Sequence, residues 1–174
     1  MTTKNINRYI IMHNRNIIDD VYARMNDPKN GCSVIIPHVC DNLAVFSNAF
    51  CAVIDKYFPI VKTNFQLAGK QSLGQTQFIE VAKNKTSEHN LIIANMVAQN
   101  GFKSSTNIRP INYAALSYCM NSVNAYAKDF KKQKDHLEIH CPKFGTGSSG
   151  GNWKFILDLI HDTWSKHDSY IYVK

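Results

Sequence analysis

The sequence predicts an α/β fold of three layers, in which helices cover both faces of a central, mostly parallel mixed sheet of about six strands. Two observations support this prediction. Short apolar runs suited to strands alternate along the chain with segments whose apolar residues recur at helical spacing. Two of the runs also lead into loops of small or polar residues that open helices. In such folds these loops meet at the carboxyl edge of the sheet, where ligands bind.

The elements are expected in a regular order. Strands are predicted over residues 8–12, 33–40, 78–82, 91–97, 137–144 and 170–173. Helices are predicted over residues 17–25, over 46–57 with a stop at Pro59, over 111–130, and from Trp153 onward. Apolar residues within 111–130 recur at helical spacing and predict a core stripe, namely Leu116, Met120, Val123, Ala127 and Phe130. No linker or repeat interrupts the pattern, so residues 1–174 are expected to form a single domain.

The charge of the chain suits an anionic ligand. The formal net charge is +7, which fits a phosphate-rich molecule as well as nucleic acid. Most basic residues are scattered, and one small cluster, Lys128, Lys131, Lys132 and Lys134, is interpreted as a solvated helix end. No apolar run approaches the roughly 18 residues that cross a bilayer, so no membrane partner is expected.

The cysteines indicate a reduced protein. Five cysteines form an odd number without a Cys-x-x-Cys pair, and no apolar segment follows the first residues to suggest a secretory signal. A cytoplasmic location is therefore expected. His38 and Cys40 share a strand face, and His140-Cys141 could lie near them, but no tight ligand spacing accompanies these residues. Neither a metal nor another cofactor is expected.

A glycine-rich loop is the strongest single motif. After the apolar run that ends near Phe144, the chain reads Gly-Thr-Gly-Ser-Ser-Gly-Gly-Asn and then opens a helix at Trp153. Glycines allow positive φ and close backbone approach, and the start of a helix favours an anion. The motif thus predicts a phosphate cradle, although a glycine loop taken alone also fits a flexible connection.

A second loop and three further blocks make the pattern specific. The run His-Val-Cys-Asp-Asn-Leu-Ala-Val-Phe-Ser-Asn-Ala-Phe at 38–50 resembles the first ligand loop of macro domains. Blocks at 73–78, 94–101, 110–116 and 142–153 follow in the order of that family. The chain resembles in particular the branch that includes ADP-ribose 1″-phosphate phosphatases and their bacterial and phage relatives. The resemblance runs from about Tyr9 to Val173.

This resemblance implies a pocket for ADP-ribose, its 1″-phosphate, or ADP-ribose attached to a protein or nucleic acid. The first loop would flank the distal ribose and diphosphate with Asp41, Asn42, Ser47, Asn48, Ala49 and Phe50. The second loop would hold phosphates with Gly145, Thr146, Gly147, Ser148, Ser149, Gly150, Gly151 and Trp153. Asn16 stands where relatives place the acid that binds adenine.

Two residues are the candidates for catalysis. His38 matches the histidine that phosphatase-like members carry before the first loop, where it fits general acid–base chemistry. The alternative for His38 is a histidine packed at a strand end. Asn152 occupies the position of an acid that precedes the tryptophan in that branch, and an amide cannot act as a base near neutral pH.

The chain departs from the branch at other positions as well. It has Asp41-Asn42 in place of Asn-Asp, which puts a carboxylate where an amide would meet the distal ribose. Ser47-Asn48-Ala49 replaces a Gly-x-Gly turn, so side chains stand where glycine permits close approach.

Three functional hypotheses follow. The first is a hydrolase that acts on ADP-ribose 1″-phosphate or removes ADP-ribose from a modified target. The second is a macro-type module that binds an ADP-ribose-related ligand or a modified macromolecule without turnover. The third is a basic nucleic-acid-binding protein on the same scaffold, which the scattered charge supports only weakly. If a phage encodes the chain, the expected location is the host cytoplasm.

Overall fold

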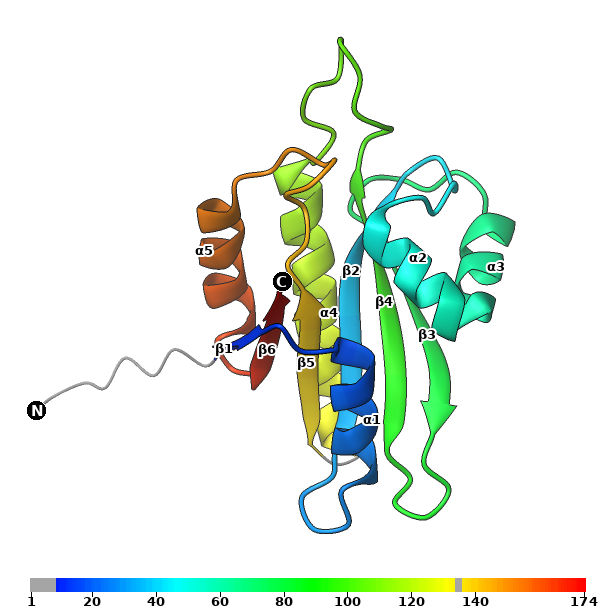
Figure 1. Ribbon diagram of the computed structural model, residues 1–174, viewed down its shortest axis with the longest axis vertical. Helices are drawn as coiled ribbons and strands as arrows, with labels where there is room; N and C mark the ends of the chain where they lie inside the picture. The colour runs from blue at the N-terminus through cyan, green and yellow to red at the C-terminus, as the bar shows by residue number, and fades with distance from the viewer. Residues whose placement is uncertain (1–8, 134–135) are drawn as a thin grey trace, which may run out of the picture.

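The computed structural model describes residues 9–133 and 136–174, and it confirms the predicted α/β architecture (Figure 1). The strands are β1 (Tyr9–His13), β2 (Ser33–Asp41), β3 (Thr76–Lys83), β4 (Asn90–Gln99), β5 (Leu137–Pro142) and β6 (Ser169–Val173). The helices are α1 (Ile17–Asn26), α2 (Ala49–Tyr57), α3 (Pro59–Leu67), α4 (Tyr113–Gln133) and α5 (Trp153–Trp164).

The strands form one mixed sheet in the order β1-β6-β5-β2-β4-β3. All neighbouring pairs are parallel except β3 and β4, which run antiparallel at one edge. Every residue of β2 and β4 is buried, as expected for central strands covered on both faces. The carboxyl ends of β2, β4 and β5 therefore meet at one edge of the sheet.

Helices cover the two faces in separate groups. The core on one face contains α4 and α5, whereas the core on the other contains α1, α2 and α3. Side chains of β2 alternate between these cores, because successive residues of a strand point to opposite faces. Ile35 and Val39 face α4 and α5, whereas Ile36 and Cys40 face the other helices.

The helix predicted over 46–57 ends where expected, at Tyr57, but it begins three residues later than predicted. Helix α2 begins only at Ala49, because the Asn48 side chain accepts a hydrogen bond from the Cys51 backbone N–H and caps the helix. Phe46 lies in the preceding loop with φ of 61°. Pro59 does not stop helical structure but begins α3, since proline fits the first position of a helix.

Other boundaries shift by a few residues. The strand predicted over 137–144 ends at Pro142, and α4 begins at Tyr113 because Ile111 forms a bridge with Gln99 instead. The predicted core stripe of α4 is confirmed, with four of its members fully buried and Phe130 packed partly against them.

The end of α4 agrees with a simpler expectation. Lys128 and Lys132 are exposed towards the end of α4, as expected for a solvated helix end, while Lys134 lies outside the described residues. Within 9–133 and 136–174, no helix combines the length and apolar character needed to cross a bilayer.

Candidate ligand-binding site

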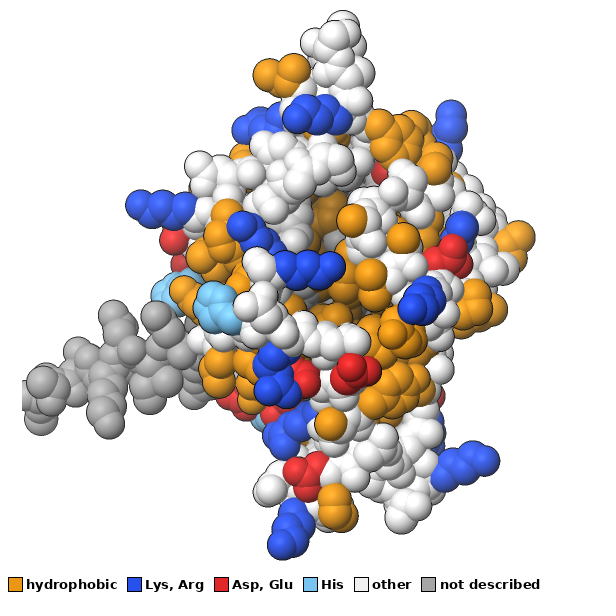
Figure 2. All heavy atoms as spheres, viewed as in Figure 1, with side chains coloured by type: hydrophobic (Ala, Val, Ile, Leu, Met, Phe, Trp, Pro, Cys, Tyr) orange, Lys and Arg blue, Asp and Glu red, His pale blue; other side chains and the backbone are white. Residues whose placement is uncertain are grey.

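Two loops meet at the carboxyl edge of the sheet. We call residues 42–48, between β2 and α2, the first loop, and residues 143–152, between β5 and α5, the second loop. Gln99 at the end of β4 joins them: its backbone oxygen accepts from Asn42 N at 3.0 Å, and its side-chain oxygen accepts from the Ser149 hydroxyl at 2.7 Å. Figure 2 shows a hollow between the two loops, with apolar side chains in its depth and Lys or Arg side chains beside it.

The first loop closes around the Asp41 carboxylate. Its Oδ1 accepts from the backbone N–H groups of Leu43 at 2.9 Å and Val45 at 3.0 Å, and its Oδ2 accepts from Phe46 N at 2.9 Å. Ala44 and Phe46 both adopt positive φ, 65° and 61°, which costs roughly 1–2 kcal/mol for each residue with a Cβ. The three charge-assisted hydrogen bonds offset that strain.

Asp41 is therefore directed into the loop. Its side chain lies at the base of the first loop, 3% exposed, with both oxygens occupied by backbone donors. The sequence placed this carboxylate beside a distal ribose. In the structure its observed contacts are those that shape the loop.

The remaining first-loop candidates have distinct surroundings. Asn42 accepts from Gly101 N at 2.9 Å, and its amide donates to the Asn100 side chain at 3.3 Å. Ser47 and Ala49 are exposed at the start of α2. Asn48 donates to the Val39 carbonyl at 2.5 Å in addition to capping α2. The ring of Phe50 meets the His38 ring edge-on, with centroids 5.6 Å apart.

Three glycines of the second loop are required by the loop's own packing. Gly145 has φ of 74°, and a Cβ there would lie 2.9 Å from Ile156 Cδ1. A Cβ on Gly151 would lie 2.3 Å from the Gly145 carbonyl oxygen. Gly150 has φ of 71° and lies close to the Ile108 carbonyl oxygen. These positions hold the loop against α5 and the segment before α4.

Gly147 is different, because a Cβ there would meet no atom within 4 Å. It lies in a run of unused donors: within the described part of the chain, no acceptor hydrogen-bonds the backbone N–H groups of residues 146–149. Successive free N–H groups in a loop form a concavity suited to an anion. The second loop therefore has free backbone donors, whereas the first loop uses three of its own on Asp41.

The end of the second loop is fixed by α5. The Asn152 side chain accepts from Phe155 N at 3.3 Å as the helix cap, and Asn152 N donates to the Tyr113 hydroxyl at 2.7 Å. Lys143, at the other end of the loop, places its Nζ over the Trp153 ring at 5.5 Å. The sequence prediction named Trp153 but not Lys143, although a lysine just before a glycine loop was a readable signal.

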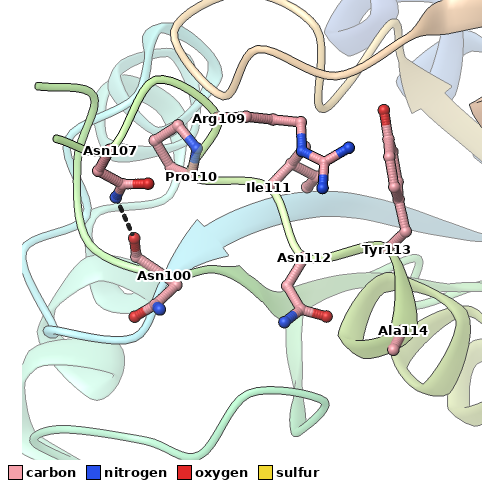
Figure 3. A pocket seen from close by; sticks show the side chains of 8 residues that line it. All are labelled: Asn100, Asn107, Arg109, Pro110, Ile111, Asn112, Tyr113 and Ala114. Carbon is pink, nitrogen blue, oxygen red and sulfur yellow. Dashed lines mark hydrogen bonds between the residues drawn. The ribbon is translucent and has the colours of Figure 1, made fainter. Parts of the chain in front are cut away.

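A pocket of about 370 Å³ opens beside the second loop (Figure 3). It is lined by the segment between β4 and α4, where the Arg109 guanidinium lies over the Tyr113 ring at 4.8 Å. Asn100, Asn107 and Asn112 add amide groups. None of these residues was predicted from sequence to belong to a site, although the blocks at 94–101 and 110–116 contain most of them.

His38 is enclosed beneath the first loop. It is 1% exposed, and its Nε2 lies 2.7 Å from the Asn95 side-chain oxygen. The Cys40 and Cys51 sulfurs lie 3.8 Å and 3.9 Å from its Nδ1. Asn95 and the two thiols surround both ring nitrogens, so none of these contacts connects His38 with the hollow between the two loops.

The two thiols beside His38 differ in acidity. Burial raises the pKa of Cys40 well above its usual range. The Cys40 thiol, together with His38, instead lowers the pKa of Cys51 below its usual range, against the opposing effect of burial. The sequence had considered His140-Cys141 as neighbours of His38. The structure brings Cys51 there instead, because Cys141 faces the opposite core and His140 bonds to Tyr172.

Asn16 begins α1 at a third position of the same edge. Its side chain accepts from Ile18 N at 3.0 Å, so the expected adenine-binding group is also a helix cap. Arg15 beside it forms a two-point ion pair with Asp20, and this hydrogen bonding lowers the pKa of Asp20.

A buried ion pair anchors the strand that carries the second loop. Arg24 of α1 donates to both carboxylate oxygens of Glu138 in β5, at 2.9 and 2.6 Å. Burial alone would raise the pKa of Glu138, but hydrogen bonds from His140 and Arg24 outweigh burial and hold that pKa at about 2.

Comparisons with known proteins identify the fold. No protein-family model matches the chain, and no curated protein sequence matches it. A macrodomain protein from Streptomyces coelicolor is similar with a TM-score of 0.68 at 21% identity, over 95% of this chain and 99% of that one. The macrodomain of Mycobacterium tuberculosis DarG gives 0.68 at 12% identity, over 95% and 98%.

A third solved structure contains a ligand. Thermosipho africanus DarTG in complex with ADP-ribose is similar with a TM-score of 0.62 at 14% identity, over 80% of this chain and 38% of that one. At these identities the likeness establishes the fold, so this chain has a macrodomain fold.

Proposed function

We propose that this protein binds ADP-ribose or an ADP-ribose derivative, with the phosphates on the second loop. The observation that carries the proposal is the run of unused backbone N–H groups at residues 146–149, next to the start of α5. Such donors suit a diphosphate because they and the helix dipole both favour negative charge. The complex of Thermosipho africanus DarTG with ADP-ribose supports this choice of ligand.

The charge around the second loop supports the same ligand. The net charge is +7, and Lys143 and Arg109 lie at the loop and at the adjoining pocket. The first loop carries the opposite sign at its base, in Asp41. A diphosphate is therefore drawn towards the second loop rather than towards the first.

Binding without turnover is the form of the function that we propose. His38 is shut off by Asn95, Cys40 and Cys51, and Asn152 is an amide that caps α5. Neither group is a free base beside the second loop. Hydrolysis of ADP-ribose 1″-phosphate, or release of ADP-ribose from a target, remains a prediction of the sequence resemblance. An ADP-ribosylated macromolecule is the partner that a binding module of this kind would recognise.

Calorimetric titration tests the proposal. ADP-ribose should bind and adenosine should not, because adenosine lacks the phosphates that the second loop would hold. Gly147→Ala should weaken ADP-ribose binding about tenfold while leaving the unfolding midpoint near that of the parent, since its Cβ meets no protein atom within 4 Å. Absence of heat at millimolar ADP-ribose, or equal binding of adenosine, would overturn the proposal.

A further inference from the structure

Three metal-ligating side chains converge below the first loop, away from the proposed phosphate site. His38 and Cys40 of β2 and Cys51 of α2 are all buried, and their ligand atoms lie within 4.8 Å of one another. The elements that bear them are joined by the first loop itself. A group that bound all three would therefore tie the two ends of that loop together.

A chain of hydrogen bonds determines which nitrogen of His38 is free. The backbone carbonyl oxygen of Asn64 can only accept a hydrogen bond, so the group of Gln77 that faces it at 3.3 Å is the side-chain amide nitrogen, which donates. The Gln77 oxygen then accepts from the Asn95 amide nitrogen at 2.9 Å. The Asn95 oxygen is left to accept from His38, which puts the imidazole proton on Nε2.

His38 is therefore in the tautomer that can bind a metal through Nδ1. In a neutral imidazole with its proton on Nε2, Nδ1 carries an available lone pair, and both sulfurs lie within 3.9 Å of Nδ1. Metal-binding histidines usually donate their other ring N–H to a carbonyl or carboxylate, which fixes the ring orientation. Asn95 supplies that acceptor from β4.

The spacing fits a small d¹⁰ cation. Zinc bonds of about 2.3 Å to sulfur and about 2.0–2.1 Å to nitrogen place the two ligand atoms about 3.6 Å apart around a tetrahedron. The Nδ1 to sulfur distances are 3.8 Å and 3.9 Å. Cys40 Sγ is also 3.9 Å from Nε2, so this sulfur lies beside the ring, and metal binding requires the Cys40 side chain to turn towards the Nδ1 lone pair.

We propose that His38, Cys40 and Cys51 bind one zinc ion, which fastens β2 to the start of α2 across the first loop. Two thiolates and one imidazole are a ligand set that zinc uses, and they leave the fourth position of the tetrahedron open. The proposal revises the expectation from sequence that no metal binds. It requires no ADP-ribose, so it stands or falls independently of the proposed function.

The test uses the full chain, reduced and stripped of metal, and titrated with Co²⁺ and then Zn²⁺. One equivalent of Co²⁺ should give the charge-transfer absorption of a thiolate ligand and the intense visible bands of tetrahedral cobalt, and Zn²⁺ should displace it. Zinc should also raise the unfolding midpoint, because a ligand that binds only the folded state stabilises it. Absence of these bands with excess Co²⁺ would overturn the proposal, as would binding of Cu⁺ but not Zn²⁺.

Matched variants locate the site. Cys51→Ser should abolish the thiolate absorption, whereas Cys119→Ser should leave it unchanged. Cys119 is an equally buried thiol whose contact with the Gln75 carbonyl a serine can keep. Gln77→Ala should weaken zinc binding about tenfold by releasing Asn95, without removing a ligand. If Cys51→Ser fails to fold, Gln77→Ala still decides, and unchanged zinc affinity in that variant would contradict the assigned tautomer and with it the site.

Discussion

The two loops at the carboxyl edge of the sheet use their backbone donors in opposite ways. The first loop folds around an internal anion, the Asp41 carboxylate, which accepts three of its N–H groups. The second loop reaches its shape through glycine packing and leaves the N–H groups of residues 146–149 without a partner in the described chain. The first loop thus uses its backbone donors within the protein, whereas the second loop has N–H groups that a ligand could accept from.

The difference teaches how a macrodomain fold can tolerate a first loop without glycines. Relatives are expected to have a Gly-x-Gly turn where this chain has Ser47-Asn48-Ala49. Here positive φ falls earlier, at Ala44 and Phe46, and the Asp41 carboxylate stabilises it. The presence of a carboxylate at position 41 is then explained by the shape of the loop.

Removal of Asp41 should have the largest effect on stability. Asp41→Ala leaves three buried or half-buried N–H groups without an acceptor and two strained residues without support, so it should cost at least about 3 kcal/mol of unfolding free energy. Asp55→Ala is the control, since it removes only a surface ion pair with Lys62 and should cost less than about 1 kcal/mol. Urea denaturation measures both variants. Equal losses would mean that the first loop does not depend on Asp41.

Acid should lower the unfolding free energy by protonating Glu138, in the strand below the second loop. This loss should be somewhat smaller than the loss caused by Asp41→Ala. The pKa of Glu138 is about 2 in the folded protein and near 4.5 in an ordinary carboxyl group, so its contribution is complete above about pH 4.5 and is lost as the pH falls towards 2. That contribution is roughly 3 kcal/mol. Glu138→Gln should flatten this part of the profile of unfolding free energy against pH. If the variant lost unfolding free energy with falling pH as steeply as the parent, Glu138 would not be the group responsible.

Asn152→Asp should have the smallest effect on folding and gives the second loop an anion of its own. Because Asn and Asp cap helices about equally well, the unfolding free energy should change by less than about 0.5 kcal/mol. The added carboxylate should weaken ADP-ribose binding by about fivefold, the size expected for one like charge near a solvated phosphate. Calorimetry checks the affinity. Phosphate release from ADP-ribose 1″-phosphate, measured in parallel, would favour the hydrolase hypothesis if the variant gained it.

The prediction of a three-layer fold succeeded because its signals are local. The alternation of strand and helix patterns, and the glycine loop before Trp153, can be recognised without knowing which distant residues touch. The start of α2 was misplaced because Phe46 continues the apolar spacing of that helix. Phe46 instead packs into the core beneath the loop, and Asn48, two residues later, caps the helix.

The sequence by itself determined the layer architecture, the order of the elements and the presence of a glycine-rich loop before α5, because hydrophobic periodicity and glycine chemistry act over a few neighbouring residues. Only the tertiary structure decided what the polar residues do. Gln99 joins the two loops, and Cys51 rather than Cys141 meets His38. The tautomer of His38 depends on Asn64 and Gln77, which lie on other elements. Such contacts join segments far apart in the chain, and no local pattern contains them.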